Sequence, residues 1–202
     1  MRQSRRQSLT VTNLLGAAVE FTAMAAITAV VLPPAIAAAS SGRAQRTVRW
    51  TEAPVMSCNR NEPYYELTNG APYTATFEER VYPTAEHLFQ SFRFYGTRPD
   101  LAERIRTATS PRAAREEAER QRRDQRHNWS KEQLEMMDCV LAHKFAQHAA
   151  LANVLLGTGY RYLVLNSYDD AFWGCGPKGQ GRNELGKALM RLRDKLRGSG
   201  QV

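Results

Sequence analysis

Apolar residues recur at helical spacing along most of the chain after residue 84, and this periodicity limits the possible folds more than any other feature. The final segment shows it most clearly, because its leucines follow at alternating intervals of four and three residues: Leu185, Leu189, Leu192 and Leu196. Residues 160–167 (YRYLVLNS) are typical of a buried strand, and short strands are expected between residues 47 and 82. The sequence therefore predicts an α+β fold, a single, mainly helical domain with a small sheet.

Capping signals divide the helical region into successive segments. The residues expected at the helix N-termini are Thr84, Asp100, Ser110, Ser130 and Asn183. Ser110 gives the strongest signal, because Pro111 follows it at the first helical position. Glu103 and Gln133 complete capping boxes for the second and fourth helices. Before the first helix, Asn69–Gly70 predicts a hairpin turn or a longer loop.

The first 45 residues differ in composition from the rest of the chain. They are rich in Ala, Ser and Arg, and Glu20 is their only acid. This composition is compatible with a mitochondrial transit segment, a secretory signal or an extension without a fold of its own. A stable membrane span is not expected, because Glu20 and Thr22 interrupt the apolar run and Pro33–Pro34 ends it. We therefore divide the chain into an N-terminal extension, residues 1–45, and one domain, residues 46–202.

Charge and cysteine content restrict the functional classes. The formal net charge is +8, but residues 1–50 carry +5 of it, so the domain is nearly balanced and polyanion binding is not required. Arginines crowd the stretch Arg120–Arg126, which is typical either of a solvated helix face or of a nucleic-acid contact. The three cysteines lie far apart and no metal-binding spacing occurs. We therefore expect reduced thiols, no metal, no cofactor and an intracellular, cytoplasmic location.

Acidic residues at two places in the sequence are candidates for a functional role. Glu86 lies in the first turn of an aromatic helix, where it is either a dipole-compensating acid or a catalytic one. Asp169 and Asp170 follow the buried strand and precede Trp173. That pattern is typical either of a turn or of a binding site in which an aromatic side chain contacts a flat ring of the ligand and an acid makes a polar contact with it.

A glycine-rich stretch leads into the last helix. Residues 174–186 contain five glycines together with Lys178 and Arg182. Glycines let backbone amides approach an anion, and a helix N-terminus adds partial positive charge, so this segment is a candidate phosphate site. Its spacing matches neither a Walker loop nor GxGxxG, so nucleotide folds of those types are not supported.

Five motifs occur in the order found in the NADAR family, the YbiA-like N-glycosidases. They are PTAEHLFQ, RHNW, LAHKF, LLGTG and the run from DDAFWGCG to GRNELGKALM, and the match covers roughly residues 60–197. The resemblance implies an α+β domain that hydrolyses N-glycosidic bonds. It also implies a small-molecule substrate, either a ribosylaminopyrimidine phosphate of the riboflavin pathway or an ADP-ribosylated base.

The resemblance further implies which residues form the site. Glu86 and Asp170 would be the catalytic carboxylates that stabilise an oxocarbenium-like state, position water or transfer a proton, with the division of roles left open. Trp129 and Trp173 would contact the base, whereas Lys144 and the 174–183 segment would hold phosphate. The complete set of expected substrate-binding residues is Asn69, Gln90, Arg126, Trp129, Lys144, Trp173, Gly174, Lys178, Arg182 and Asn183.

One pair of positions departs from the family pattern. An acidic pair often follows the strand in this family, but Leu165 and Asn166 occupy those positions here. The departure leaves open a second function, a non-catalytic module that binds ADP-ribose or a ribonucleotide. A third interpretation is an enzyme that removes ADP-ribose from bases in nucleic acid and holds the strand through Arg120–Arg126.

Overall fold

The computed structural model describes residues 55–56 and 59–198, so the interpretations of residues 1–45 and of the strand expected near residue 50 lie outside the described residues. The helices are α2 (Ala85–Phe92), α3 (Pro99–Arg106), α4 (Pro111–Arg120), α5 (Trp129–Gln147), α6 (Ala149–Gly157) and α7 (Glu184–Gly198), with short 3-10 helices η1 (Tyr65–Leu67) and η2 (Arg122–Asp124). The strands are β1 (Val55–Met56), β2 (Ala75–Phe77), β3 (Arg80–Tyr82) and β4 (Leu163–Val164). The expected α+β architecture, mainly helical with little sheet, is confirmed.

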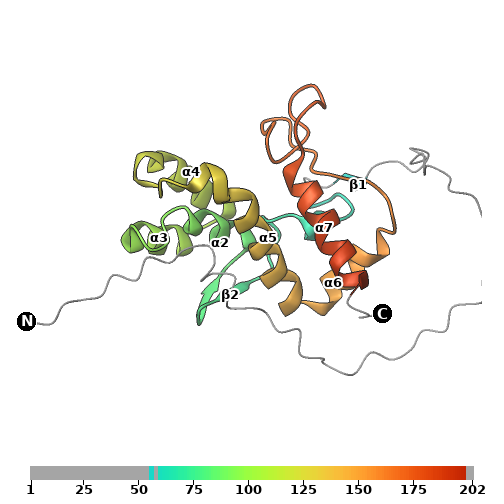
Figure 1. The fold of residues 1–202 in the computed structure, drawn as a ribbon, viewed down its shortest axis with the longest axis horizontal. Coiled ribbons are helices and arrows are strands. Elements are labelled where there is room, and N and C mark those ends of the chain that lie inside the picture. Colours follow the sequence, from blue (N-terminus) through green and yellow to red (C-terminus); the bar gives the residue numbers. More distant parts are fainter. Residues whose placement is uncertain (1–54, 57–58, 199–202) are drawn as a thin grey trace, which may run out of the picture.

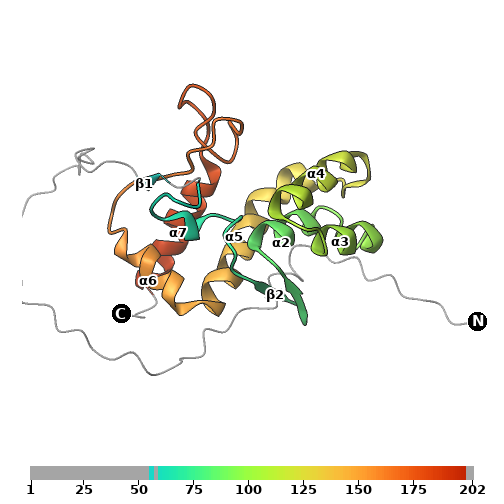
Figure 2. The same cartoon turned by 180° about the vertical axis from the view of Figure 1, so that it is seen from behind.

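Helix α5 runs through the middle of the domain (Figure 1). Helices α2, α3 and α4 lie on one side of it and α6 and α7 on the other, as the reverse view also shows (Figure 2). α2 packs against α3, α4 and α5, while α7 packs against α5 and α6. Within the described part of the chain, no helix is both long and apolar enough to cross a bilayer.

Two apolar cores hold these helices. The larger core joins α2, α5, α6 and α7, and it buries the leucine face that the sequence predicts for α7. The smaller core fixes α3 and α4 against the end of α2 through residues such as Phe94, Ile105 and Ala118. Every residue of α2 is buried, including Glu86. The polar side chains of this short helix are therefore held in fixed positions by the packing around them.

The strands are short and form two separate pairs among the described residues. β1 and β4 are parallel, with Val55 opposite Leu163, and β2 and β3 form an antiparallel hairpin. The hairpin turns at Glu78 and Glu79, whose φ angles are 44° and 62°. A two-residue hairpin turn of this kind requires positive φ at both central positions. Asn69–Gly70 lies in the loop between η1 and β2, so of the two expected alternatives the longer loop is confirmed and the hairpin is not.

The capping signals are accurate for α4 and displaced for α3 and α5. Ser110 caps α4, and its Oγ accepts a hydrogen bond from the backbone N–H three residues on, at 3.1 Å. α3 begins at Pro99 instead of after Asp100, and α5 begins at Trp129 instead of after Ser130. The reason is that the carbonyls of residues 98 and 128 already accept the first helical hydrogen bonds.

Candidate active site

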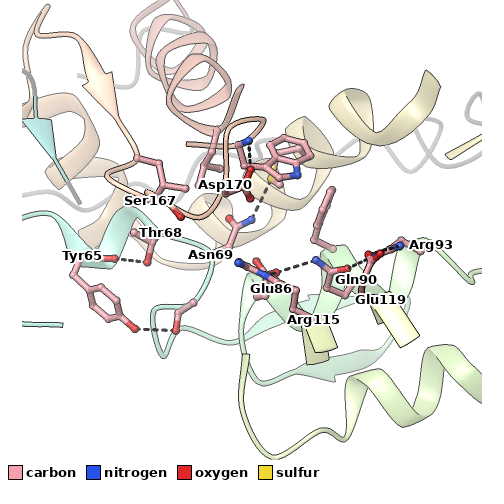
Figure 3. A pocket seen from close by; sticks show the side chains of 16 residues that line it. Tyr65, Thr68, Asn69, Glu86, Gln90, Arg93, Arg115, Glu119, Ser167 and Asp170 are labelled. Carbon is pink, nitrogen blue, oxygen red and sulfur yellow. Dashed lines mark hydrogen bonds and ion pairs between the residues drawn. The ribbon is translucent and has the colours of Figure 1, made fainter. Parts of the chain in front are cut away.

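A cavity of about 410 Å³ lies where α2, α4, α5 and α7 meet the loops that follow η1 and β4 (Figure 3). Five of the residues expected to act in the site line it: Asn69, Glu86, Gln90, Asp170 and Trp173. Three further charged residues also line it: Arg93, Arg115 and Glu119. The volume suits a small molecule, and the lining combines charged groups with an aromatic wall.

Glu86 lies at the N-terminal end of α2. Its backbone N–H donates to the carbonyl of Asn69 at 3.0 Å, so the loop after η1 closes the first turn of the helix. The carboxylate side chain is only 5% exposed. Its Oε1 accepts hydrogen bonds from Nε2 of Gln90 at 2.9 Å and from Nε of Arg115 at 3.0 Å. Two donors on one oxygen hold the buried carboxylate in a single orientation.

Gln90 links Glu86 to a second arginine. Its Oε1 accepts from Nη1 of Arg93 at 3.1 Å, so its Nε2 is the end that donates to Glu86. Arg93 is buried, donates to Gln125 at 2.9 Å and forms an ion pair with Glu119 at 3.4 Å. Burial lowers the pKa of Arg93, and the Glu119 carboxylate opposes that shift. The network therefore fixes both the orientation of the Gln90 amide and the position of Glu86.

Asn69 contributes an acceptor to the cavity wall. The residue is buried, and its Nδ2 lies 3.2 Å from Sδ of Met137. Its Oδ1 is buried and has no hydrogen-bond partner among the described residues. A buried carbonyl oxygen without a partner is energetically costly. Its position in the cavity wall therefore makes it a candidate acceptor for a donor group on a bound ligand.

Asp170 lies in the loop between β4 and α7. Its Oδ1 accepts hydrogen bonds from the backbone N–H groups of Phe172 at 3.0 Å and of Trp173 at 2.7 Å. One carboxylate oxygen thus closes a turn, while the residue also lines the cavity, so the two interpretations of this acid are compatible. The Trp173 ring packs edge-on against Phe89 of α2, with ring centroids 5.1 Å apart. The pair forms the aromatic wall of the cavity.

Lys144, an expected phosphate contact, lies outside the set of residues that line the cavity. Its side chain is fully buried, and its Nζ donates to the backbone carbonyls of Glu66 and Thr68, at 2.7 Å each. These contacts hold the segment that carries Asn69. Lys144 therefore reaches the site only through the backbone of the loop after η1.

Two residues of the RHNW motif also lie behind the cavity wall. Trp129 is buried and packs against Phe89, with ring centroids 5.2 Å apart, so it supports the aromatic wall from the core. Arg126 forms an ion pair with Glu132 at 2.5 Å. Neither side chain, both of them expected to contact substrate, belongs to the set of residues that line the cavity.

The glycine-rich segment packs against itself and not against the cavity. A Cβ added to Gly174 would lie 2.8 Å from Cβ of Ser167, so glycine is needed there for close approach. Asn183 donates to the carbonyl of Leu163 at 2.8 Å and accepts from the N–H of Leu165 at 2.9 Å, which ties α7 to β4. The cations of this segment, Lys178 and Arg182, are exposed and outside the lining set, and Arg182 pairs with Glu184 at 3.1 Å.

Sequence reasoning missed Arg93, Arg115 and Glu119. Arg93 has a usable signal, because Glu86, Gln90 and Arg93 recur at helical spacing as a polar stripe on a helix that is otherwise buried. Arg115 and Glu119 are four residues apart and therefore share one face of α4. The charges of α4 are equally typical of a solvated helix, and the local sequence does not indicate that this face meets α2.

Fold and cavity together define a class: a small α+β domain whose partly buried, charged and aromatic-walled cavity has the form of an enzyme site for a small polar molecule. The sequence profile of the NADAR domain matches residues 49–197. The chain therefore belongs to the NADAR family, as its motifs indicate.

Relatives and a solved structure agree with this assignment. The chain is 35% identical over 136 residues to the N-glycosidase YbiA of Escherichia coli (strain K12), covering 67% of this chain and 84% of the relative. It is also 35% identical over 145 residues to a riboflavin biosynthesis protein of Vibrio vulnificus (strain YJ016), covering 72% of this chain but only 39% of that protein. The NMR structure of E. coli YbiA superposes with a TM-score of 0.66 at 32% identity, covering 78% of this chain and 93% of that one.

Proposed function

We propose that the cavity hydrolyses the N-glycosidic bond of a ribosyl-phosphate or ADP-ribosyl substrate. The class of enzyme, an N-glycosidase, rests on the identity to relatives that carry this name. The substrate is our proposal. It is supported by a cavity of small-molecule size and by two relatives named as riboflavin biosynthesis proteins, from Vibrio vulnificus and Zea mays.

The observation that carries the mechanism is the buried, doubly hydrogen-bonded carboxylate of Glu86. Cleavage of a ribosyl C–N bond develops positive charge on the sugar, and a fixed carboxylate nearby stabilises that charge. Gln90 and Arg115 both donate to Oε1 of this carboxylate, and we assign the attacking water to the same group. The C–O bond forms as the C–N bond breaks, the water passes its proton to Glu86, and the leaving nitrogen takes up a proton, for which we assign Asp170 as the donor.

In this proposal, Asp170 and the aromatic wall contact the base that leaves. Oδ1 of Asp170 is held by two backbone N–H groups, so contact with substrate falls to Oδ2. Trp173, supported by Phe89, supplies a flat surface on which a heterocyclic base can lie. The unpartnered Oδ1 of Asn69 accepts a hydrogen bond from a hydroxyl or amino group of the substrate.

The competing function is a module that binds ADP-ribose or a ribonucleotide without cleaving it. One observation favours it: Leu165, where the family often has an acid, lines the cavity with an apolar side chain. The retained, fixed carboxylates of Glu86 and Asp170 favour hydrolysis. Calorimetry beside a product assay separates the two functions, because a binder gives heat and no free base.

A role in nucleic-acid binding receives little support from the arginines of the Arg120–Arg126 stretch. Arg120 pairs with Glu117, Arg122 pairs with Glu119 at 3.5 Å, and Arg126 is largely buried against Glu132. Paired arginines offer less charge to a phosphate backbone than unpaired ones. We therefore assign a small molecule, and not a nucleic-acid strand, as the preferred substrate.

The test is a product assay. The purified chain is incubated with a panel of ribosylaminopyrimidine phosphates and ADP-ribosylated bases, and free base is measured by mass spectrometry. We expect release of base from at least one member of the panel at a rate proportional to enzyme concentration. Binding of several members with no release from any of them would overturn the proposal in favour of the binding module.

A further inference from the structure

The two arginines that line the cavity are held very differently. The side chain of Arg93 is 9% exposed and contacts three partners, Gln90, Gln125 and Glu119. The side chain of Arg115 is 58% exposed and reaches the cavity from α4 with its Nε on Glu86. An exposed arginine loses little packing when it moves, whereas a buried one loses several contacts at once. Arg115 is therefore the more exposed cation of the pair, and it can move with a smaller loss of packing.

An anionic substrate meets a cavity in which each lining arginine is already matched by an acid. Arg115 pairs with Glu86 and Arg93 pairs with Glu119, while Asp170 adds a third carboxylate. Lysine and arginine side chains are otherwise missing from the lining set. A phosphate group in the cavity therefore competes with a carboxylate for the arginine that it binds.

We propose that Arg115 recognises the phosphate of the substrate, and that its transfer from Glu86 to the phosphate leaves more negative charge on the Glu86 carboxylate for catalysis. The inference rests on the proposed hydrolysis of a ribosyl phosphate and adds the residue that selects for the phosphate. A phosphate offers more negative charge and more acceptor oxygens than one carboxylate. A guanidinium group can bind it through two parallel hydrogen bonds, in a bidentate arrangement. Binding of the correct substrate and the release of the Glu86 carboxylate from Arg115 thus occur in one step.

The proposal predicts that the enzyme selects phosphorylated ribosyl compounds over those without phosphate. A ribosyl compound without phosphate leaves Arg115 on Glu86, so Oε1 stays occupied by two donors and the carboxylate keeps less charge for the developing cation. A phosphorylated compound withdraws one of the two donors. Gln90 remains, because Arg93 holds its amide from the other side at 3.1 Å. The carboxylate therefore stays oriented after Arg115 has left.

The first experiment measures binding. Calorimetry compares ribose 5-phosphate with ribose for the wild type, Arg115→Gln, Arg115→Lys and the control Arg112→Gln. Arg112 lies on the same helix, is 88% exposed and pairs with Glu116 outside the cavity. We expect Arg115→Gln to weaken ribose 5-phosphate binding by about tenfold or more, Arg115→Lys to restore part of it and Arg112→Gln to have no effect. Equal affinity of wild type and Arg115→Gln for ribose 5-phosphate, or no binding by the wild type, overturns the proposal.

The second experiment measures turnover on a substrate with and without its phosphate. Arg115→Gln should lower kcat/KM for the phosphorylated substrate, mainly through KM, and should lower it much less for the dephosphorylated substrate. An equal loss on both substrates overturns the inference, because Arg115 would then serve Glu86 alone. Failure of the parent proposal looks different: the wild type binds ribose 5-phosphate through Arg115 and releases no base from any substrate.

Discussion

The Nζ atom of Lys144 lies 2.7 Å from the carbonyl oxygen of Thr68, in the interior of the domain. A second carbonyl, that of Glu66, accepts from the same nitrogen, so one side chain of α5 holds both ends of a short backbone segment. The next residue, Asn69, lines the cavity and closes the first turn of α2. A buried lysine thus supports the position of Glu86 without entering the site.

The burial of Lys144 should make stability depend on pH. Burial lowers its pKa from 10.5 to about 7, so above pH 7 the folded protein releases a proton that the unfolded chain keeps. The free energy of unfolding of the wild type should therefore rise relative to Lys144→Met from pH 7 to 9, with a slope of up to about 1.4 kcal/mol per pH unit. Urea unfolding at pH 6, 7, 8 and 9 measures this difference. Parallel curves for the two proteins would show that the lysine keeps its proton.

Gly186 should be intolerant of any side chain. A Cβ at this position would overlap the carbonyl oxygen of Leu163 and the side chain of Asn183, which are backbone and a tightly bonded amide. We expect Gly186→Ala to lower the free energy of unfolding by about 1–3 kcal/mol, since neither neighbour has room to move. The control is Gly157→Ala, where no heavy atom lies within 4 Å of the added Cβ, and its Tm should stay within a few degrees of the wild type. Equal Tm losses in both variants would contradict the packing argument.

Capping residues predict the start of a helix correctly where the cap bonds within the first turn of that helix. Ser110 followed by Pro111 gives the correct start of α4 because both residues act within one turn. By sequence Asn69–Gly70 fits either a hairpin or a longer loop, and the structure has the loop, in which the Asn69 carbonyl accepts from the N–H of Glu86. The chain turns instead at two glutamates, where the sequence carries no favourable turn residue.

The site is predictable only in part, for a physical reason. Glu86 and Asp170 stand in motifs, and both line the cavity. Lys144 stands out in sequence as a charge at the edge of an apolar helix face, but its partners are backbone carbonyls, which have no sequence signature. Arg115 lies on an exposed helix, and only the packing of α4 against α2 gives it a place in the site.

The hairpin between β2 and β3 stores strain that one substitution should relieve. Glu79 has a φ of 62°, a conformation that disfavours residues with a Cβ by roughly 1–2 kcal/mol. We expect Glu79→Gly to raise the free energy of unfolding by about 0.5–1 kcal/mol, after allowance for the extra freedom of glycine in the unfolded chain. Thermal unfolding of Glu79→Gly beside Glu79→Ala measures the effect. The same Tm for both variants would argue against strain at this turn.

Glu86→Gln should separate catalysis from structure most cleanly. Gln keeps the size of the side chain and an acceptor oxygen for Gln90 and Arg115, but it removes the negative charge and the ability to take a proton from water. We expect kcat for base release to fall by about 10²–10⁴-fold with little change in Tm. The matched control is Glu116→Gln, an exposed glutamate on α4 that pairs with Arg112 outside the cavity, which should keep full activity. Turnover by a folded Glu86→Gln within about twofold of the wild type would remove Glu86 from the mechanism and leave Asp170 as the carboxylate to test next.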